Sequence, residues 1–394
     1  MISRNWPNEF VRACVTISLL LGASLAAQTK APAIALIDPA DAVTWQNWTR
    51  ELGWQVITAP APPADIDSRV KALAAAVEDA VKKGTADPAR IYLAGRGDAS
   101  AAVFYAISRV PDLWAAAAAL GGSPKPALDT NRLYAANFTN VPVLWIASDD
   151  AKPLADKLIA AKLNLEFRSA ATGANAAALM QWFAQHKREA APAAIDCETN
   201  SPAFARCYWI QLTKFDAAER NDVLATTRIP GGSGAKLDLG NFAFKLDEPG
   251  PGVLVASLPE KYSGPLKVGD RLIALDGKPL EDARQYVELM DKTTDEKLAV
   301  ATVQRGKDRV RVETRIVLPV RDSGVTARVQ AQVLPAEKEI QIVTRTITEL
   351  RVTIAPQWIP ATLLWNGLSL ENLKEAGCWT LSVQRELLHA EKCP

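Results

Sequence analysis

The feature that most constrains the fold is a regular alternation of two patterns between residues 31 and 190. Short, continuous apolar segments occur at 33–37, 91–94 and 143–146, among others. Between them, apolar residues recur at every third or fourth position, as in 66–83. Continuous apolar strands are buried on both faces, and their alternation with amphipathic helices is typical of a mostly parallel sheet covered by helices. We therefore predict an α/β domain over 31–190.

The second half of the chain follows a different pattern. β-Branched residues and polar–apolar alternation dominate it, and the stretch 190–194, which is alanine and proline, separates it from the first half. A glycine-rich break at 231–234 precedes a β-rich unit with one predicted helix, at 281–290. Alternation then continues to the C-terminus and predicts a small antiparallel sheet. The predicted units are a linker with a β segment at 191–235, a β-rich domain at 236–319 and an all-β domain at 320–394.

The N-terminal residues 1–27 have the order of a secretory signal peptide. Basic Arg4 and Arg12 precede an uncharged apolar stretch, which ends in small residues up to Ala26 and Ala27. An uncleaved membrane anchor is the alternative, but the stretch is marginal for a span of about 20 apolar residues. We therefore expect export to the periplasm or the extracellular space, cleavage after Ala26 or Ala27, and no stable membrane insertion after cleavage.

The cysteines point to the same compartment. Cleavage removes Cys14 and leaves Cys197, Cys207, Cys378 and Cys393. An even number of cysteines in an exported protein predicts disulfides, and these allow three pairings. We favour Cys197–Cys207 and Cys378–Cys393, because each pair is close in sequence. A zinc site is the alternative, although the spacing is not that of a zinc finger and no histidine lies nearby.

The charge balance excludes one class of partner. The chain has 45 basic and 44 acidic residues and a formal net charge of +1. Because a protein that neutralises many phosphates normally carries a basic excess, we do not expect nucleic acid to bind. The acidic pairs are scattered and the two histidines, His186 and His389, are far apart in sequence, so no metal site and no cofactor are expected.

Residues 87–99, with 110–115 and 121–123 after them, resemble the nucleophile-elbow region of α/β-hydrolases of the esterase and carboxylesterase type. In that family, G-x-S-x-G places a serine on a sharp strand-to-helix turn, with small residues two positions to either side. Gly95 and Ala99 match the small positions here, and Gly97 occupies the position of the nucleophile. Glycine has no side chain that can attack a carbonyl. The resemblance therefore implies the hydrolase fold without its nucleophile.

Two neighbouring residues, Asp98 and Ser100, are the fallback nucleophiles. Placing Asp98 at the apex of the turn would put Arg96 at a position that must be small. Ser100 falls in the first turn of the following helix and is expected to face elsewhere.

The other catalytic positions of the family are also incomplete. Asp149 or Asp150, after the strand at 143–146, matches the family's acid. The family's histidine belongs on the loop before the last helix, here 171–175, which contains none. The loop at 38–41 also lacks the family's oxyanion glycines. Since a hydroxyl without a base is not activated, the sequence favours a pseudo-hydrolase.

Residues 252–280 resemble bacterial PDZ domains, above all the stretch from Leu266 to Leu280. Its Gly269-Asp270 and Asp276-Gly277 pairs predict tight turns. PDZ domains add an extended peptide to a sheet edge and hold its terminal carboxylate with backbone N–H groups. The resemblance implies the following peptide-binding residues, on an edge strand and the helix beside it: Leu239, Gly240, Asn241, Phe242, Ala243, Phe244, Tyr286, Val287 and Met290. Only Gly240 remains of the family's glycine-rich loop, so a groove filled by the chain itself is the alternative.

Together these observations predict an exported, non-catalytic binding or scaffold protein. It would recognise a peptide or protein C-terminus through the PDZ-like domain, which a pseudo-hydrolase carries. The competing hypothesis is a secreted esterase of the serine-hydrolase type with an unorthodox nucleophile, Asp98 or Ser100.

Overall fold

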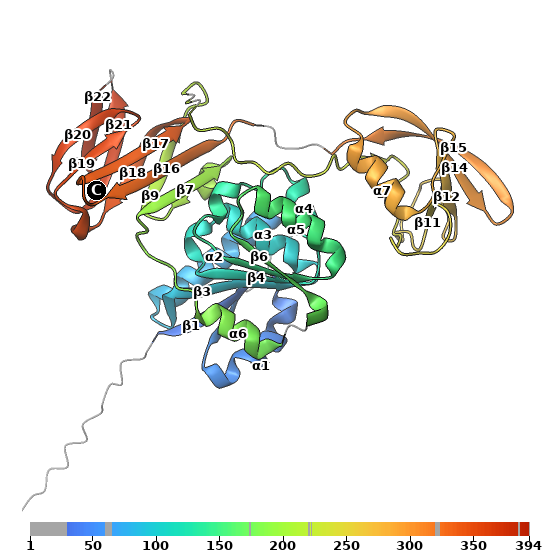
Figure 1. Cartoon of the computed structure of the whole chain (residues 1–394), viewed down its shortest axis with the longest axis horizontal. Helices are drawn as coiled ribbons and strands as arrows, with labels where there is room; N and C mark the ends of the chain where they lie inside the picture. Colours follow the sequence, from blue (N-terminus) through green and yellow to red (C-terminus); the bar gives the residue numbers. More distant parts are fainter. Residues whose placement is uncertain are drawn as a thin grey trace, which may run out of the picture.

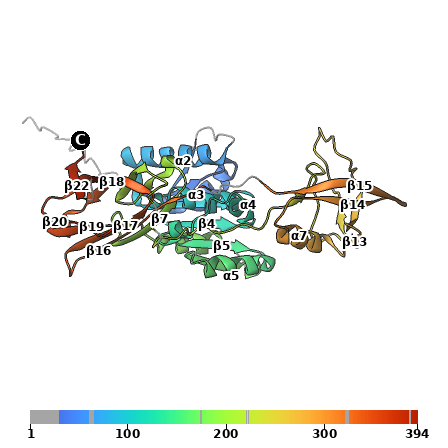
Figure 2. The same cartoon turned by 90° about the horizontal axis from the view of Figure 1, so that it is seen from above.

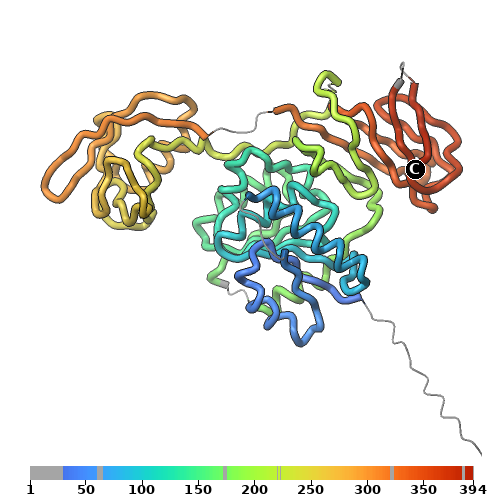
Figure 3. The backbone as a smooth tube through the Cα atoms, turned by 180° about the vertical axis from the view of Figure 1, so that it is seen from behind, coloured from blue at the N-terminus to red at the C-terminus, as the bar shows by residue number. Residues whose placement is uncertain are grey.

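The computed structural model describes residues 30–59, 65–172, 175–219, 221, 223–319, 324–384 and 387–393. The predicted signal peptide, 1–27, lies outside these residues. Figures 1, 2 and 3 show an α/β body that lies between a β sandwich and a smaller β-rich unit. Among the described residues, no helix has both the length and the apolar character needed to cross a bilayer.

The α/β body contains a six-stranded, fully parallel sheet in the order β2-β1-β3-β4-β5-β6. Its strands are β1 (Ala31–Leu36), β2 (Gln55–Thr58), β3 (Ala86–Arg96), β4 (Ala116–Leu120), β5 (Val143–Ala147) and β6 (Leu165–Ser169). One face packs against α2 (Ile66–Lys82), α3 (Ala99–Arg109), α4 (Lys125–Asp129) and α5 (Lys152–Ala160). The other face packs against α1 (Ala42–Thr49) and α6 (Ala176–Ala184), as Figure 1 shows. The predicted parallel α/β fold is confirmed.

The β sandwich consists of two five-stranded sheets, in the orders β20-β19-β17-β16-β7 and β22-β21-β18-β9-β8, around one apolar core. The first strands are β7 (Ala194–Thr199), β8 (Arg206–Cys207) and β9 (Ile210–Phe215). The others are β16 (Ala327–Leu334), β17 (Glu339–Arg345), β18 (Ile347–Ile354), β19 (Ala361–Trp365), β20 (Leu368–Leu373), β21 (Gly377–Gln384) and β22 (Leu387–Lys392).

This arrangement differs from a linker at 191–235 followed by a separate domain at 320–394. The strands β7 to β9 belong to the same sandwich as the C-terminal strands, because β7 pairs with β16 and β9 pairs with β18. The β-rich unit, residues 236–317, is therefore an insertion between β9 and β16 of one sandwich. We call it the inserted unit.

The inserted unit has a small antiparallel sheet and one helix, α7 (Ala283–Lys292), around its own core. Its strands are β10 (Lys236–Leu237), β11 (Val253–Leu254), β12 (Arg271–Leu275), β13 (Lys278–Pro279), β14 (Lys297–Arg305) and β15 (Asp308–Val317). The turn at Asp276 and Gly277, with φ values of 50° and 76°, joins β12 to β13. This tight turn confirms the prediction made from the Asp-Gly pair.

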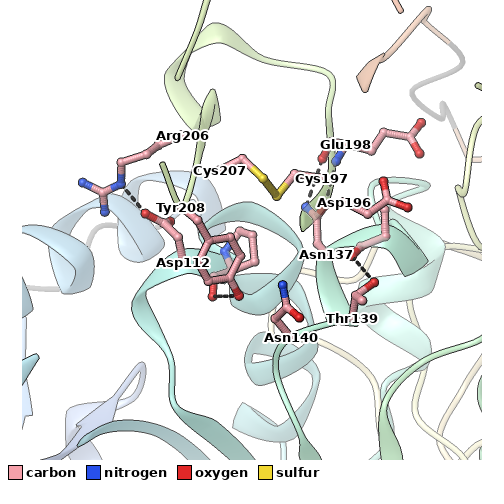
Figure 4. Close-up of a disulfide and its surroundings, with 12 residues drawn as sticks. Asp112, Asn137, Thr139, Asn140, Asp196, Cys197, Glu198, Arg206, Cys207 and Tyr208 are labelled. Carbon is pink, nitrogen blue, oxygen red and sulfur yellow. Dashed lines mark hydrogen bonds and ion pairs between the residues drawn. A yellow bond between two sulfur atoms is a disulfide. The ribbon is translucent and has the colours of Figure 1, made fainter. Parts of the chain in front are cut away.

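One disulfide links the two sheets of the sandwich, and the other lies within one sheet. Cys197 on β7 is bonded to Cys207 on β8, and Cys378 on β21 is bonded to Cys393, directly after β22. These are the two pairs that the spacing favours, and disulfides of this kind are typical of an oxidising compartment. Figure 4 shows the first of them, beside the α/β body.

A buried glutamate on β7 holds the sandwich to the chain that leads into the inserted unit. The backbone of Glu198 exchanges two hydrogen bonds with the side chain of Asn137, which belongs to the α/β body (Figure 4). The carboxylate of Glu198 accepts hydrogen bonds from Thr227 and, within the same sheet, from Thr326 directly before β16 and from Arg345 at the end of β17. Glu198 therefore connects the sandwich to the α/β body and to the segment that leads into the inserted unit.

Candidate functional site

The turn between β3 and α3 has the geometry of the predicted elbow. Gly97 adopts a φ of +54°, and its N–H donates to the carbonyl of Leu120 at the end of β4, at 2.8 Å. A Cβ on Gly95 would lie 2.8 Å from the carbonyl oxygen of Ala99, so only glycine fits there. A Cβ on Gly97 would meet no heavy atom within 4 Å. Gly95 therefore occupies the position that must be small. The apex of the turn has space for a side chain, but the residue there is Gly97.

The two fallback nucleophiles lie in different environments. Ser100 is completely buried, and its hydroxyl lies 3.4 Å from the carbonyl oxygen of Leu120. It faces the protein interior. Asp98 is exposed and lines a cavity of about 320 Å³ between α2, α3 and α4. Beside it, the guanidinium of Arg96 lies over the ring of Trp48 and 3.5 Å from Asp41.

The candidate acid lies at the carboxyl ends of the parallel strands, as the elbow does. The N–H of Gly121, after β4, donates to the carbonyl of Ile146 at the end of β5, and Asp149 and Asp150 follow within four residues. Both carboxylates are exposed, and the hydroxyl of Ser148 donates to Asp150.

The histidine His186 lies near the amino ends of the strands, at the opposite end of the sheet from the elbow turn. His186 follows α6, and its neighbour Arg188 donates its N–H to the carbonyl of Ala89, near the start of β3. Since Gly97 comes eight residues after Ala89, His186 lies near the opposite end of β3 from the elbow. The ring of His186 packs edge-on against Trp182, with centroids 4.5 Å apart, and burial lowers its pKa. Residues 173 and 174 of the expected histidine loop lie outside the described residues.

The predicted peptide-binding residues line one groove of about 480 Å³ in the inserted unit. From one side come Gly240, Asn241, Phe242 and Phe244, and from α7 come Tyr286, Val287 and Met290. Leu239 is buried in the core beneath them, whereas Ala243 is exposed and does not line the groove. The ring of Phe244 packs edge-on against Tyr286, at a centroid distance of 5.9 Å. Most of the residues that the sequence resemblance implies therefore lie together.

The segment 239–244 is not the regular strand that the resemblance implies. It has a single isolated bridge, in which Ala243 donates to the carbonyl of Ser257 at 2.9 Å and accepts from the N–H of Ala256 at 2.8 Å. The positive φ of Gly240, +76°, interrupts any longer pairing. In an antiparallel pair, alternate residues direct their backbone groups to opposite sides. The N–H and C=O of Phe242 and Phe244 therefore point away from Ser257, and both residues line the groove.

A tyrosine that the sequence analysis does not single out fixes this segment. The hydroxyl of Tyr262 donates to the carbonyl of Leu239 and accepts from the N–H of Leu266. Its ring packs so closely on Gly240 that a Cβ there would lie 2.7 Å from a ring carbon. Gly240 is therefore required by both its φ and this contact.

The groove ends against the α/β body. Lys125, on α4, reaches across to Asp291 on α7, with its Nζ at 2.7 and 2.9 Å from the two carboxylate oxygens. Lys125 and Asp129 of the α/β body, together with Lys236, line the same groove. Sequence reasoning misses this wall, because Lys125 and Asp291 are 166 residues apart.

Among the described residues, no group of three histidine, cysteine, aspartate or glutamate side chains is arranged to hold a metal ion.

No protein-family model and no curated protein matches the chain. Among solved structures, the chain is similar to esterase PE8, with 16% identity over 36% of this chain and 82% of that one, and a TM-score of 0.27. It is also similar to a variant of SOBER1 from Arabidopsis thaliana, with 15% identity over 40% of this chain and 98% of that one, and a TM-score of 0.31. An esterase from the bacterial hormone-sensitive lipase family is 18% identical over 36% of this chain and 66% of that one, with a TM-score of 0.27. Similarities at this level carry no inference about activity.

Proposed function

We propose that this chain is an exported, non-catalytic binding protein that recognises the C-terminus of a peptide or protein in the groove of the inserted unit, with a PDZ-like mode of binding. The groove supports this proposal most strongly. The segment 240–244 and α7 line one cavity of about 480 Å³, and the pairing of Ala243 with Ser257 directs the backbone groups of Phe242 and Phe244 away from Ser257. An extended peptide would pair with that segment and place its side chains against Tyr286, Val287 and Met290.

The chemistry of the α/β body supports a non-catalytic role for it. Hydrolysis on this fold needs a nucleophile at the apex of the elbow and a base within hydrogen-bond reach of it. Gly97 offers no nucleophile, and His186 lies beside the opposite end of β3. We infer that this body serves as a scaffold.

One observation favours the alternative, an esterase with an unorthodox nucleophile. Asp98 is exposed and lines a cavity large enough for a small acyl group. An aspartate nucleophile would still need a base to activate the water that releases the product. The alternative predicts hydrolysis of short-chain nitrophenyl esters that is lost in Asp98→Ala.

Peptide binding can be tested with the oxidised, mature full-length protein on an array of heptapeptides with free carboxyl termini. We expect a subset of these peptides to bind. Val287→Glu places a charge in the groove and should abolish binding, whereas Leu289→Glu places the same charge on the same helix outside the groove and should not. The proposal fails if no peptide binds the wild-type protein, or if the two variants bind alike.

A further inference from the structure

We propose that Lys125, on the α/β body, contacts the terminal carboxylate of the bound peptide, and that Asp291 forms an ion pair with this lysine when no peptide is bound. The inference deepens the proposed function and rests on it. It gives the hydrolase-like body a direct part in recognition.

The direction of peptide binding places the carboxylate at this end of the groove. A peptide that pairs antiparallel to the segment 242–244 has its C-terminus beside the start of that segment. The start is the turn at Gly240 and Asn241, which lines the groove together with Lys125 and Asp291. The ammonium group therefore lies at the end where the peptide chain must stop.

Asp291 shows that a carboxylate fits against this ammonium group. Both of its oxygens lie within 2.9 Å of the Nζ of Lys125, and both side chains remain more than one-third exposed. A peptide carboxylate has the same chemistry and the same charge. A lysine ammonium group has three donors, so it can exchange one carboxylate for another or hold both.

The segment that leads from the sandwich into the inserted unit narrows this end of the groove. Gly231 and Gly232 pass between α4 and α7, where a Cβ on Gly231 would lie 2.8 Å from the carbonyl oxygen of Leu128. A Cβ on Gly232 would lie 2.8 Å from a carboxylate oxygen of Asp291. The hydroxyl of Ser233 donates to the carbonyl of Met290, in the last turn of α7. These close approaches position Asp291 opposite Lys125.

The inference implies that recognition depends on a free carboxyl terminus and on the α/β body together. A peptide whose terminus is amidated can still pair with the edge segment, but it loses the contact with Lys125. Because Asp291 competes for the same cation, its removal should favour the peptide carboxylate.

The test uses the full-length protein and the tightest binder from the free-acid array, compared with its C-terminal amide by fluorescence anisotropy. Wild-type protein should bind the acid more tightly than the amide. Lys125→Gln should weaken binding of the acid about fivefold and leave the amide unchanged, since an exposed ion pair contributes up to about 1 kcal/mol. Lys125→Arg should retain the preference, and Asp291→Asn should increase the affinity for the acid.

Lys152→Gln is the matched control, because it breaks a surface lysine–aspartate pair on α5 away from the groove. It should bind both peptides as the wild-type protein does. If wild-type protein binds array peptides but Lys125→Gln leaves the ratio of acid to amide affinity unchanged, the inference about Lys125 is wrong and the proposed function stands. If wild-type protein binds none of them, both are wrong.

Discussion

Replacing Glu198 should destabilise the packing of β7 in the sandwich and its contact with the segment that leads to the inserted unit. Its carboxylate, 1% exposed, accepts hydrogen bonds from Thr226 at 2.5 Å, from the backbone and hydroxyl of Thr227 at 2.6 and 2.7 Å, and from Thr326. The guanidinium of Arg345 lies 3.4 Å away. Glu198→Gln turns one acceptor oxygen into a donor, so at least one buried donor loses its partner and Arg345 loses its counter-charge.

A buried donor without a partner costs about 1–3 kcal/mol, and breaking a buried ion pair costs about 3–5 kcal/mol. We expect Glu198→Gln to lower the opening free energy of the sandwich by about 3 kcal/mol, and Glu198→Ala by about 4 kcal/mol. Glu371→Gln, on the exposed face of β20, is the matched control and should change it by less than about 0.5 kcal/mol.

Hydrogen exchange resolved by peptide mass spectrometry measures these openings strand by strand, which suits a chain of several domains. The amides of β7 and β16 should exchange faster in Glu198→Gln, while those of β3 and β4 should keep their protection. Equal protection of β7 and β16 in Glu198→Gln and the control would refute the reasoning.

Three further changes test the elbow and the inserted unit. Gly97→Ser should fold, with a backbone strain of about 1 kcal/mol, and hydrolyse no nitrophenyl ester; turnover would show that a base is present after all. Gly95→Ala should lower stability by about 1–3 kcal/mol in thermal unfolding, because its Cβ meets backbone at 2.8 Å; an unchanged Tm would contradict the tight turn. A hydrogen bond from Arg305 lowers the pKa of Asp270 below its ordinary value of 3.8. The stability that this pair contributes is therefore fully present above about pH 4 and is lost as the pH falls through the lowered pKa. In Asp270→Asn, the free energy of unfolding of the inserted unit should fall less steeply as the pH decreases below about 4. An unchanged dependence on pH would contradict the role given to the Asp270–Arg305 pair.

The sequence predicts those parts of the fold that depend only on residues close to one another in the chain. The apolar runs around residues 34, 93 and 145 are buried strands, and the pair Asp276-Gly277 forms the turn expected of it. Both signals lie within a few residues, so no partner has to be known to interpret them.

Features that depend on distant partners could not be predicted. In the sheet, Cys197 on β7 lies opposite Val329 on β16, although the whole inserted unit separates these residues in the sequence. Nothing within 191–235 shows that its strands complete a sandwich. The groove wall at Lys125 likewise requires knowing where α4 lies relative to α7. The segment 239–244 departs from a regular strand because Tyr262 packs on Gly240, a contact across 22 residues that no periodicity reveals.

The central claim is that a peptide binds in the groove of the inserted unit and not at the sheet edge of the α/β body. Hydrogen exchange of the full-length protein, with and without a saturating array-selected free-acid peptide, tests this most directly. The account predicts slower exchange for residues 239–244 and for α7, with no change in the turn at 95–100. Protection at 95–100 with none at 239–244 would contradict it.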